Sequence, residues 1–241
     1  NALYGEDGDD YLFGQGGVDT LVGGQGDDYY DIDSLDDVVV ENLGAGMDRV
    51  QAHVDYQLSA NVEYLTLLGA ATHGTGNSLD NVIWTSSTSV VNYTLDGGVG
   101  VDTLEGALGD DTYIVGDTGD QVIEFSWTSD GTTSWINNSV DTVQASVSYT
   151  LPYNVENLIL TGAAAIDGTG NGQDNTIAGN AAANRLTGGG GIDTLIGGAG
   201  NDTYVVSMPV DSFVEATGGG VDTVESSIDW VLGTQLENLT F

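Results

Sequence analysis

The sequence predicts an all-β protein, a parallel β-roll or β-solenoid of about thirteen coils. Glycine and acidic residues recur with a period of nine residues in three parts of the chain. An apolar or aromatic residue follows most of these acids two positions later, as expected for a short strand with one inward side chain. A longer period then repeats the whole pattern, which is typical of a protein made of stacked units.

The nine-residue unit has glycine at positions one and four, an acid at position six and an apolar residue at position eight, as in GEDGDDYLF at 5–13. The glycine-rich half turns the chain, since glycine adopts the positive φ values that other residues resist. The next three residues form a strand, and position eight points inward to build an apolar ladder. The units in this frame are 5–13, 14–22, 23–31, 97–105, 106–114, 170–178, 179–187, 188–196 and 197–205.

Position six supplies the candidate metal ligands. The acids in this phase, including three in units that have lost their glycines, are Asp10, Asp19, Asp28, Asp37, Asp102, Asp111, Asp120, Asp193, Asp202 and Asp211. A further set, each member two residues before a valine, is Asp48, Asp141 and Asp222. Asparagine takes position six at Asn1, Asn175 and Asn184, which removes charge and weakens those sites. The alternative for all of these acids is that they only mark solvated turns.

Two units make one coil, so acids 18 residues apart stack on one side at about the strand spacing of ~4.8 Å. The expected pairs, with glycine carbonyls between them, are Asp10 with Asp28, Asp19 with Asp37, Asp102 with Asp120, and Asp193 with Asp211. Such a pocket offers only oxygen ligands, which calcium prefers, whereas zinc favours the cysteine that this chain lacks. The sequence therefore predicts calcium ions (Ca²⁺) in the turns.

The charge balance supports the same prediction. The 37 acidic residues face two basic residues, for a formal net charge of −35. This repulsion opposes compaction unless cations neutralise it, so we expect the chain to be largely unfolded without calcium. A nucleic acid partner is excluded because phosphate binding requires clusters of lysine and arginine. Membrane insertion is not expected, because no apolar run approaches the ~18 residues that a spanning helix needs.

The long period gives the domain organisation. Asp19, Asp102 and Asp193 lie in similar strings 83 and 91 residues apart, and NVEYLTL, NVENLIL and LENLTF recur with them. The sequence predicts one continuous solenoid over 1–241, with long repeats at about 1–96, 97–187 and 188–241, the last one truncated. The second repeat carries about ten extra residues, from Ser126 to Trp135.

These nonapeptides resemble the RTX (repeats-in-toxin) family, whose repeat is G-G-x-G-x-D-x-U-x. The resemblance covers roughly 1–40, 97–123 and 170–214, and the strings between them look like the long extracellular RTX arrays of bacteria. It implies a calcium β-roll, calcium ligation by the position-six aspartates with loop carbonyls, and export to a calcium-rich exterior by type I secretion. The family's C-terminal secretion signal is not evident before Phe241.

The function that we expect is an extracellular or cell-surface calcium-binding scaffold, such as a filament, adhesin or surface-layer segment, and not an enzyme. The alternative is the secretion and folding module of an exported hydrolase or toxin whose catalytic part is absent. Solenoid ends without polar caps indicate either a fragment of a longer array or head-to-tail stacking of this chain into a filament.

Other partners have weaker support in the sequence. The two tryptophans of the Ser126 to Trp135 insertion indicate a carbohydrate or cell-surface contact, or a loop folded back on the solenoid. His53 and His73 are one coil apart, so they form either a transition-metal pair or two separate surface histidines. The threonines at position seven allow ice binding, but Tyr11, Tyr29 and Arg185 interrupt that row.

Overall fold

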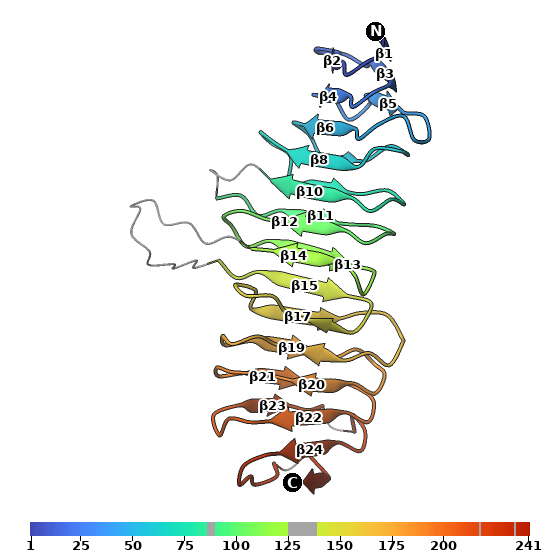
Figure 1. The fold of residues 1–241 in the computed structure, drawn as a ribbon. Helices are drawn as coiled ribbons and strands as arrows, with labels where there is room; N and C mark the ends of the chain where they lie inside the picture. The colour runs from blue at the N-terminus through green and yellow to red at the C-terminus, as the bar shows by residue number, and fades with distance from the viewer. Residues whose placement is uncertain (86–89, 125–138, 217, 234) are drawn as a thin grey trace. The chain divides into compact units, whose positions relative to one another are not determined.

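The structure is a computed structural model that describes residues 1–85, 90–124, 139–216, 218–233 and 235–241. The regular elements of the described residues are β-strands, and these strands pair in parallel (Figure 1). The predicted all-β parallel solenoid is therefore confirmed, with about twelve turns where the sequence predicts about thirteen. No described residue lies in a helix long and apolar enough to cross a membrane.

The chain divides into two compact units, Asn1–Trp127 and Thr128–Phe241, which we describe separately. In the first unit, one sheet has the order β1-β3-β5 and a second has the order β14-β12-β10-β8-β6-β4-β2. Strands β13, β11, β9 and β7 form a third group. The bounds are β1 Ala2–Asp7, β2 Tyr11–Phe13, β3 Thr20–Gln25, β4 Tyr29–Ile32, β5 Val38–Val40, β6 Arg49–Ala52, β7 Tyr56–Gln57, β8 Tyr64–Leu67, β9 His73–Thr75, β10 Val82–Thr85, β11 Thr94–Asp96, β12 Thr103–Glu105, β13 Thr112–Val115 and β14 Gln121–Ile123.

In the second unit, strands β23, β21, β19, β17 and β15 form one layer, and the other layer has the order β16-β18-β20-β22-β24-β25. The bounds are β15 Thr142–Ala145, β16 Tyr149–Thr150, β17 Asn157–Leu160, β18 Gly168–Thr169, β19 Thr176–Ala178, β20 Arg185–Thr187, β21 Thr194–Ile196, β22 Thr203–Val206, β23 Ser212–Val214, β24 Thr223–Ser226 and β25 Asn238–Thr240.

The register gives the length of each coil. Nonapeptide strands pair at a separation of 18 in the sequence, as in Tyr11 with Tyr29, which matches two units per coil. Coils in which one turn lies outside the nonapeptide frame differ. Arg49 pairs with Tyr64, a separation of 15, and Val82 pairs with Thr103, a separation of 21. The length of a coil therefore depends on its turns, while neighbouring strands within each sheet stay parallel.

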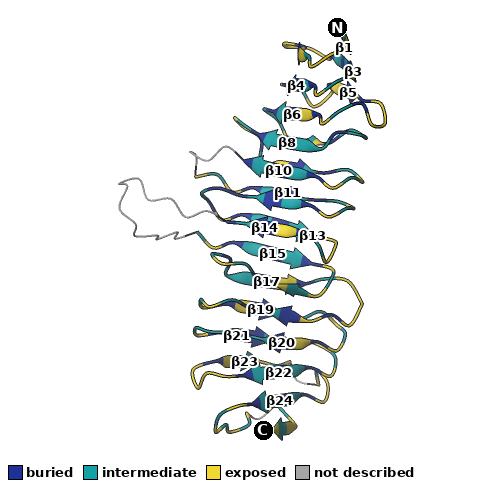
Figure 2. Ribbon diagram, viewed as in Figure 1, coloured by how far each residue is buried: buried dark blue, intermediate teal, exposed yellow. Residues whose placement is uncertain are grey.

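The core is the ladder of position-eight side chains that the sequence predicts. Leu12, Leu21, Tyr30, Leu104 and Tyr113 are buried, while the residues on either side of each are more exposed (Figure 2). Each strand thus contributes one or two inward side chains to a thin apolar core between two strand layers. One coil alone could not bury these side chains, so each depends on its neighbours.

Glycine serves two different purposes in the turns. At position four it has positive φ in seven units, with values from 109° to 134°, at Gly8, Gly17, Gly26, Gly100, Gly109, Gly191 and Gly200. At position one, glycine does not have positive φ, so the prediction that all of these glycines adopt it is wrong there. A side chain is excluded at position one for lack of space: a Cβ on Gly14 would lie 2.5 Å from Asp19 Oδ2.

Candidate metal centre

The position-six carboxylates lie in vertical register. In each predicted pair, one oxygen of the later aspartate accepts a hydrogen bond from the backbone N–H of the earlier one. The donor–acceptor distances are 2.8 Å for Asp10 with Asp28, 3.0 Å for Asp19 with Asp37, 2.9 Å for Asp102 with Asp120 and 3.3 Å for Asp193 with Asp211. The structure thus brings together all four predicted pairs.

The additional aspartates continue these columns. Asp48 accepts from the N–H of Asp28, and Asp222 accepts from the N–H of Asp202, each at 2.8 Å and across 20 residues. Asp141 is fully buried immediately before β15. These aspartates therefore occupy turn positions equivalent to position six, although each unit lacks the glycine at position one.

The second oxygen of many of these carboxylates has no hydrogen-bond partner. Among the described residues, the Oδ2 atoms that are buried without a partner belong to Asp10, Asp19, Asp28, Asp48, Asp102, Asp193 and Asp202. A buried, unpaired carboxylate oxygen is costly, and a bound cation is one way to compensate it. Loop carbonyls lie nearby: a Cβ on Gly5 would lie 2.6 Å from both Asp10 Oδ2 and the carbonyl oxygen of Gly23. This all-oxygen donor set fits calcium.

At the two position-six asparagines Asn175 and Asn184, a side-chain amide donates the hydrogen bonds that a cation would replace at an aspartate. Asn184 Nδ2 donates to the carbonyl of Ile166 at 2.6 Å, and Asn175 Nδ2 donates to the carbonyl of Val155 at 3.1 Å. An amide N–H₂ thus reaches backbone carbonyls of the preceding coil. Where aspartate stands at position six, its carboxylate and the backbone carbonyl are both hydrogen-bond acceptors. A cation would therefore have to bridge these two oxygens in place of the amide N–H₂.

Some of the predicted ligands have a protein donor at the second oxygen, and two of these lie in units that have lost the nonapeptide glycines. Asp120 Oδ2 accepts from the N–H groups of Gly116 and Asp117, and Asp37 Oδ2 accepts from the N–H of Ser34. These bonds form within the glycine-poor loops of their own units. The loop amides therefore partly satisfy these carboxylates, and each unit lacks the glycines expected of a complete site.

Sequence reasoning missed a group of glutamates. Glu63, Glu156 and Glu237 accept from the N–H groups of Asp48, Asp141 and Asp222, at 2.8, 2.9 and 2.8 Å. They lie in the recurring strings NVEYLTL, NVENLIL and LENLTF, which the sequence shows but which suggested no role. In these shorter coils, the longer glutamate side chain takes the place of the position-six aspartate.

Burial changes the titration of the carboxylates. Desolvation raises the pKa of Asp48 to about 7, and it raises the pKa values of Asp102 and Asp193 to about 6. A backbone N–H bond opposes each shift, while neighbouring carboxylates add to it. Without a cation, these groups hold protons more tightly than ordinary aspartates do.

The remaining predicted features are not brought together as a site. His53 lies 3.4 Å from Asp31 Oδ2, whereas His73 lies 3.4 Å from Asp55 Oδ2, so the two histidines contact different carboxylates. The predicted contact at Ser126 to Trp135 lies outside the described residues.

Fold and turns together define a class: a parallel β-solenoid whose turns gather carboxylate and carbonyl oxygens. The family model for the RTX calcium-binding nonapeptide repeat matches four copies, at residues 1–31, 94–113 and 169–204. The chain therefore carries RTX calcium-binding nonapeptide repeats, as the sequence predicts.

Curated relatives share only part of the chain. Endo-1,3-1,4-beta-glycanase ExsH and endo-1,3-1,4-beta-glycanase EglC, both of Rhizobium meliloti (strain 1021), are each 38% identical to it over 82 residues. The match covers 34% of this chain and 18% of each relative, so the chain spans under a fifth of their length. No solved structure matches the chain.

Proposed function

We propose that the chain is an extracellular structural segment whose solenoid folds when calcium binds in its turns. The observation that carries this proposal is the set of buried aspartate oxygens without hydrogen-bond partners. The ligands in this proposal are the predicted position-six aspartates and the additional set, with loop carbonyls completing the coordination. The two basic residues of the chain cannot neutralise 37 acidic ones, so cations from solution must do so.

An extracellular location follows from the same chemistry. Oxygen-ligand sites of extracellular modules have Kd values of about 10⁻⁴–10⁻³ M, which suits the calcium levels outside cells. Such a chain would fold after export and serve as a scaffold, as in a filament, adhesin or surface-layer segment. Head-to-tail association of the chain stays a prediction.

Protease resistance tests this function. In about 1 mM calcium we expect the chain to resist a nonspecific protease, because the bound ions stabilise the folded state. In the same concentration of magnesium we expect cleavage at least about tenfold faster, because magnesium demands a stricter octahedron than these irregular turns provide. Returning calcium to chelator-treated protein is the control for reversibility, and equal cleavage rates in the two metals would contradict the proposal.

A second candidate function is a module of an exported hydrolase, and the similarity to two β-glycanases favours it. An aromatic surface of the first unit supports a carbohydrate partner. Tyr11 stacks on Tyr29 with ring centroids 4.1 Å apart, and the Arg49 guanidinium lies 5.2 Å from the ring centre of Tyr64 and 5.1 Å from that of Trp84. These residues belong to neighbouring strands β2, β4, β6, β8 and β10, and Tyr11 is 63% exposed.

Affinity electrophoresis in a mixed-linkage β-glucan tests the second candidate. We expect the glucan to retard the calcium-loaded chain, because aromatic faces stack on sugar rings. The double variant Tyr11→Ala/Tyr29→Ala should lose about tenfold or more of that affinity. The matched control is Tyr153→Ala, which removes an exposed tyrosine of the second unit. No retardation of the wild type, or equal retardation of all three proteins, would argue against this carbohydrate surface.

A further inference from the structure

A tyrosine–glutamate pair recurs once in each long repeat. The hydroxyl of Tyr30 donates to Glu41 Oε1, that of Tyr113 donates to Glu124, and that of Tyr204 donates to Glu215. Each tyrosine occupies position eight of a nonapeptide and is fully buried, and each glutamate follows 11 residues later. The pair holds a carboxylate inside the solenoid at the end of a nonapeptide block.

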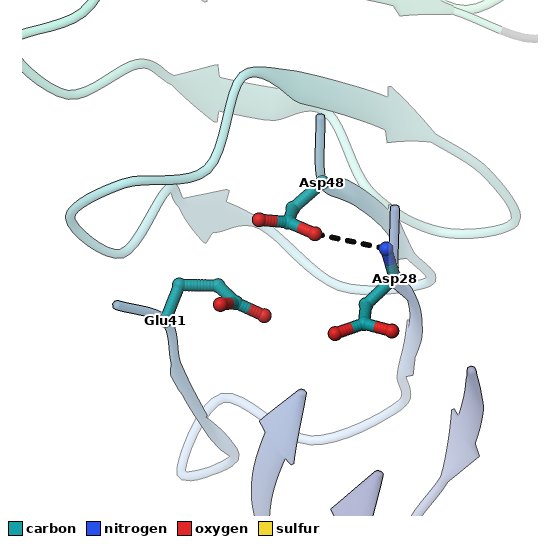
Figure 3. A group of neighbouring side chains, drawn as sticks. All are labelled: Asp28, Glu41 and Asp48. Atoms are coloured by element: carbon teal, nitrogen blue, oxygen red, sulfur yellow. Dashed lines mark hydrogen bonds between the residues drawn. The ribbon is translucent and has the colours of Figure 1, made fainter. Parts of the chain in front are cut away.

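Within each compact unit, one of these glutamates meets two aspartates of the same unit. One carboxylate oxygen each of Asp28, Glu41 and Asp48 lies within 4.8 Å of the others, and Figure 3 shows the three side chains facing a common space. Asp202, Glu215 and Asp222 form the equivalent cluster in the second unit. We call each of these two sets a carboxylate triad. Asp28 is 2% exposed, Glu41 8% and Asp48 0%, so the first triad is shielded from water.

Several oxygens of the triads have no partner. Asp28 Oδ2 and Asp48 Oδ2 are buried without a hydrogen bond in the first triad, as are Asp202 Oδ2 and Glu215 Oε2 in the second. Position-one glycine makes room for them: a Cβ on Gly23 would collide with Asp28 Oδ2, Glu41 Oε1 and the Tyr30 hydroxyl. Gly197 stands in the same relation to Asp202, Glu215 and Tyr204.

No arginine of the chain neutralises a triad. Arg49 stacks on Tyr64 and Trp84, and Arg185 pairs with Glu225 at 2.6 Å. Three carboxylates within one buried space repel each other strongly unless a cation or protons separate them. The Tyr30 hydroxyl is a single donor, and it donates to Glu41.

We propose that each carboxylate triad binds one calcium ion more tightly than the nonapeptide turns do. Affinity for calcium rises with the number of charged ligands and the rigidity of the site, and a triad supplies three carboxylates. The ligands of the first triad come from the turn before β4, the residue after β5 and the turn before β6, so the ion joins a nonapeptide block to the coil that follows. This inference rests on the proposed function, since it adds a second class of site to the same solenoid.

Native mass spectrometry at limiting calcium tests the inference. We expect the wild type to retain its most tightly held ions, and Glu41→Gln and Glu215→Gln each to hold one ion fewer. Glutamine keeps the size of the side chain, and its amide oxygen can still accept the hydrogen bond from the tyrosine hydroxyl. The matched control is Asp102→Asn, which makes the same acid-to-amide change in a nonapeptide turn that has no tyrosine–glutamate pair. This control should keep the tight ions and lose weaker binding.

The outcomes separate the inference from the proposed function. If wild type binds calcium but Glu41→Gln, Glu215→Gln and Asp102→Asn lose ions alike, the triads are not a separate class and the inference is wrong. If wild type binds no calcium, the proposed function fails with it. Should a variant not fold, anomalous scattering from a calcium-grown crystal of the wild type gives the answer. Ions in the turns with none between Asp28, Glu41 and Asp48 would overturn the inference alone.

Discussion

Removing calcium with a chelator at neutral pH is expected to abolish most of the β-sheet circular dichroism signal. Buried aspartate oxygens without partners and a net charge of −35 destabilise the folded chain, while the core is only one ladder of side chains thick. Returning calcium should restore the signal, and magnesium at the same concentration should not. A β signal that persists in chelator would contradict an obligatory role for calcium.

The same chelated protein should regain structure as the pH falls. The folded-state pKa of Asp48 is raised to about 7, and those of Asp102 and Asp193 to about 6, from an ordinary value of 3.8. A raised pKa means that the folded state binds protons more tightly, so its stability increases as pH falls through that range. We expect the β signal in chelator to rise between about pH 8 and about pH 5. A signal that stays flat would show that protons cannot replace calcium.

Replacing Gly26 by alanine should destabilise the calcium-loaded protein more than the same change at Gly8. Both glycines occupy position four with positive φ, 125° and 115°, so both variants incur backbone strain of about 1–3 kcal/mol. The room for the added methyl group differs between the two sites. A Cβ on Gly8 has no atom within 4 Å, whereas a Cβ on Gly26 would collide with the carbonyl of Gly8. Backbone atoms in the ladder cannot move aside as a flexible side chain can.

Thermal unfolding in calcium measures the difference. We expect Gly8→Ala to lower the melting temperature by a few degrees, and Gly26→Ala to lower it by at least about twice as much or to prevent folding. The calcium concentration at which half of the protein is folded should rise in both variants, and it should rise more for Gly26→Ala. A less stable fold needs more calcium to reach the same folded fraction. Equal losses in the two variants would mean that φ strain alone sets the cost and that the coils are not in the close contact described.

The sequence was sufficient for the fold because one rule repeats. Position eight must face the core and position six must face the turn, so a period of nine predicts both, and Leu12 and Asp19 lie where expected. The number of coils was harder to predict, because turns outside the nonapeptide frame vary in length. The separation of paired residues is 15 from Arg49 to Tyr64 and 21 from Val82 to Thr103. No fixed period describes those turns.

The glutamates of the site escaped prediction for a related reason. Glu41 and Glu215 lie outside the nonapeptide frame. Each is held inside the solenoid by a hydrogen bond from the hydroxyl of a buried tyrosine. A signal did exist, since each tyrosine at position eight precedes a glutamate by 11 residues in all three long repeats. Only the structure shows that this spacing places hydroxyl and carboxylate together.

The hydrogen bonds between position-six residues all run the same way along the chain. The N–H of Asp10 is satisfied by Asp28, that of Asp28 by Asp48, and that of Asp48 by Glu63. Within each unit the solenoid therefore has a polarity. Removing coils from the C-terminal side would leave unpaired donors, whereas removing them from the N-terminal side would leave free carboxylate oxygens, which water solvates readily. The end of the stack nearer the C-terminus therefore presents N–H donors to a further coil, whereas the end nearer the N-terminus presents carboxylate acceptors.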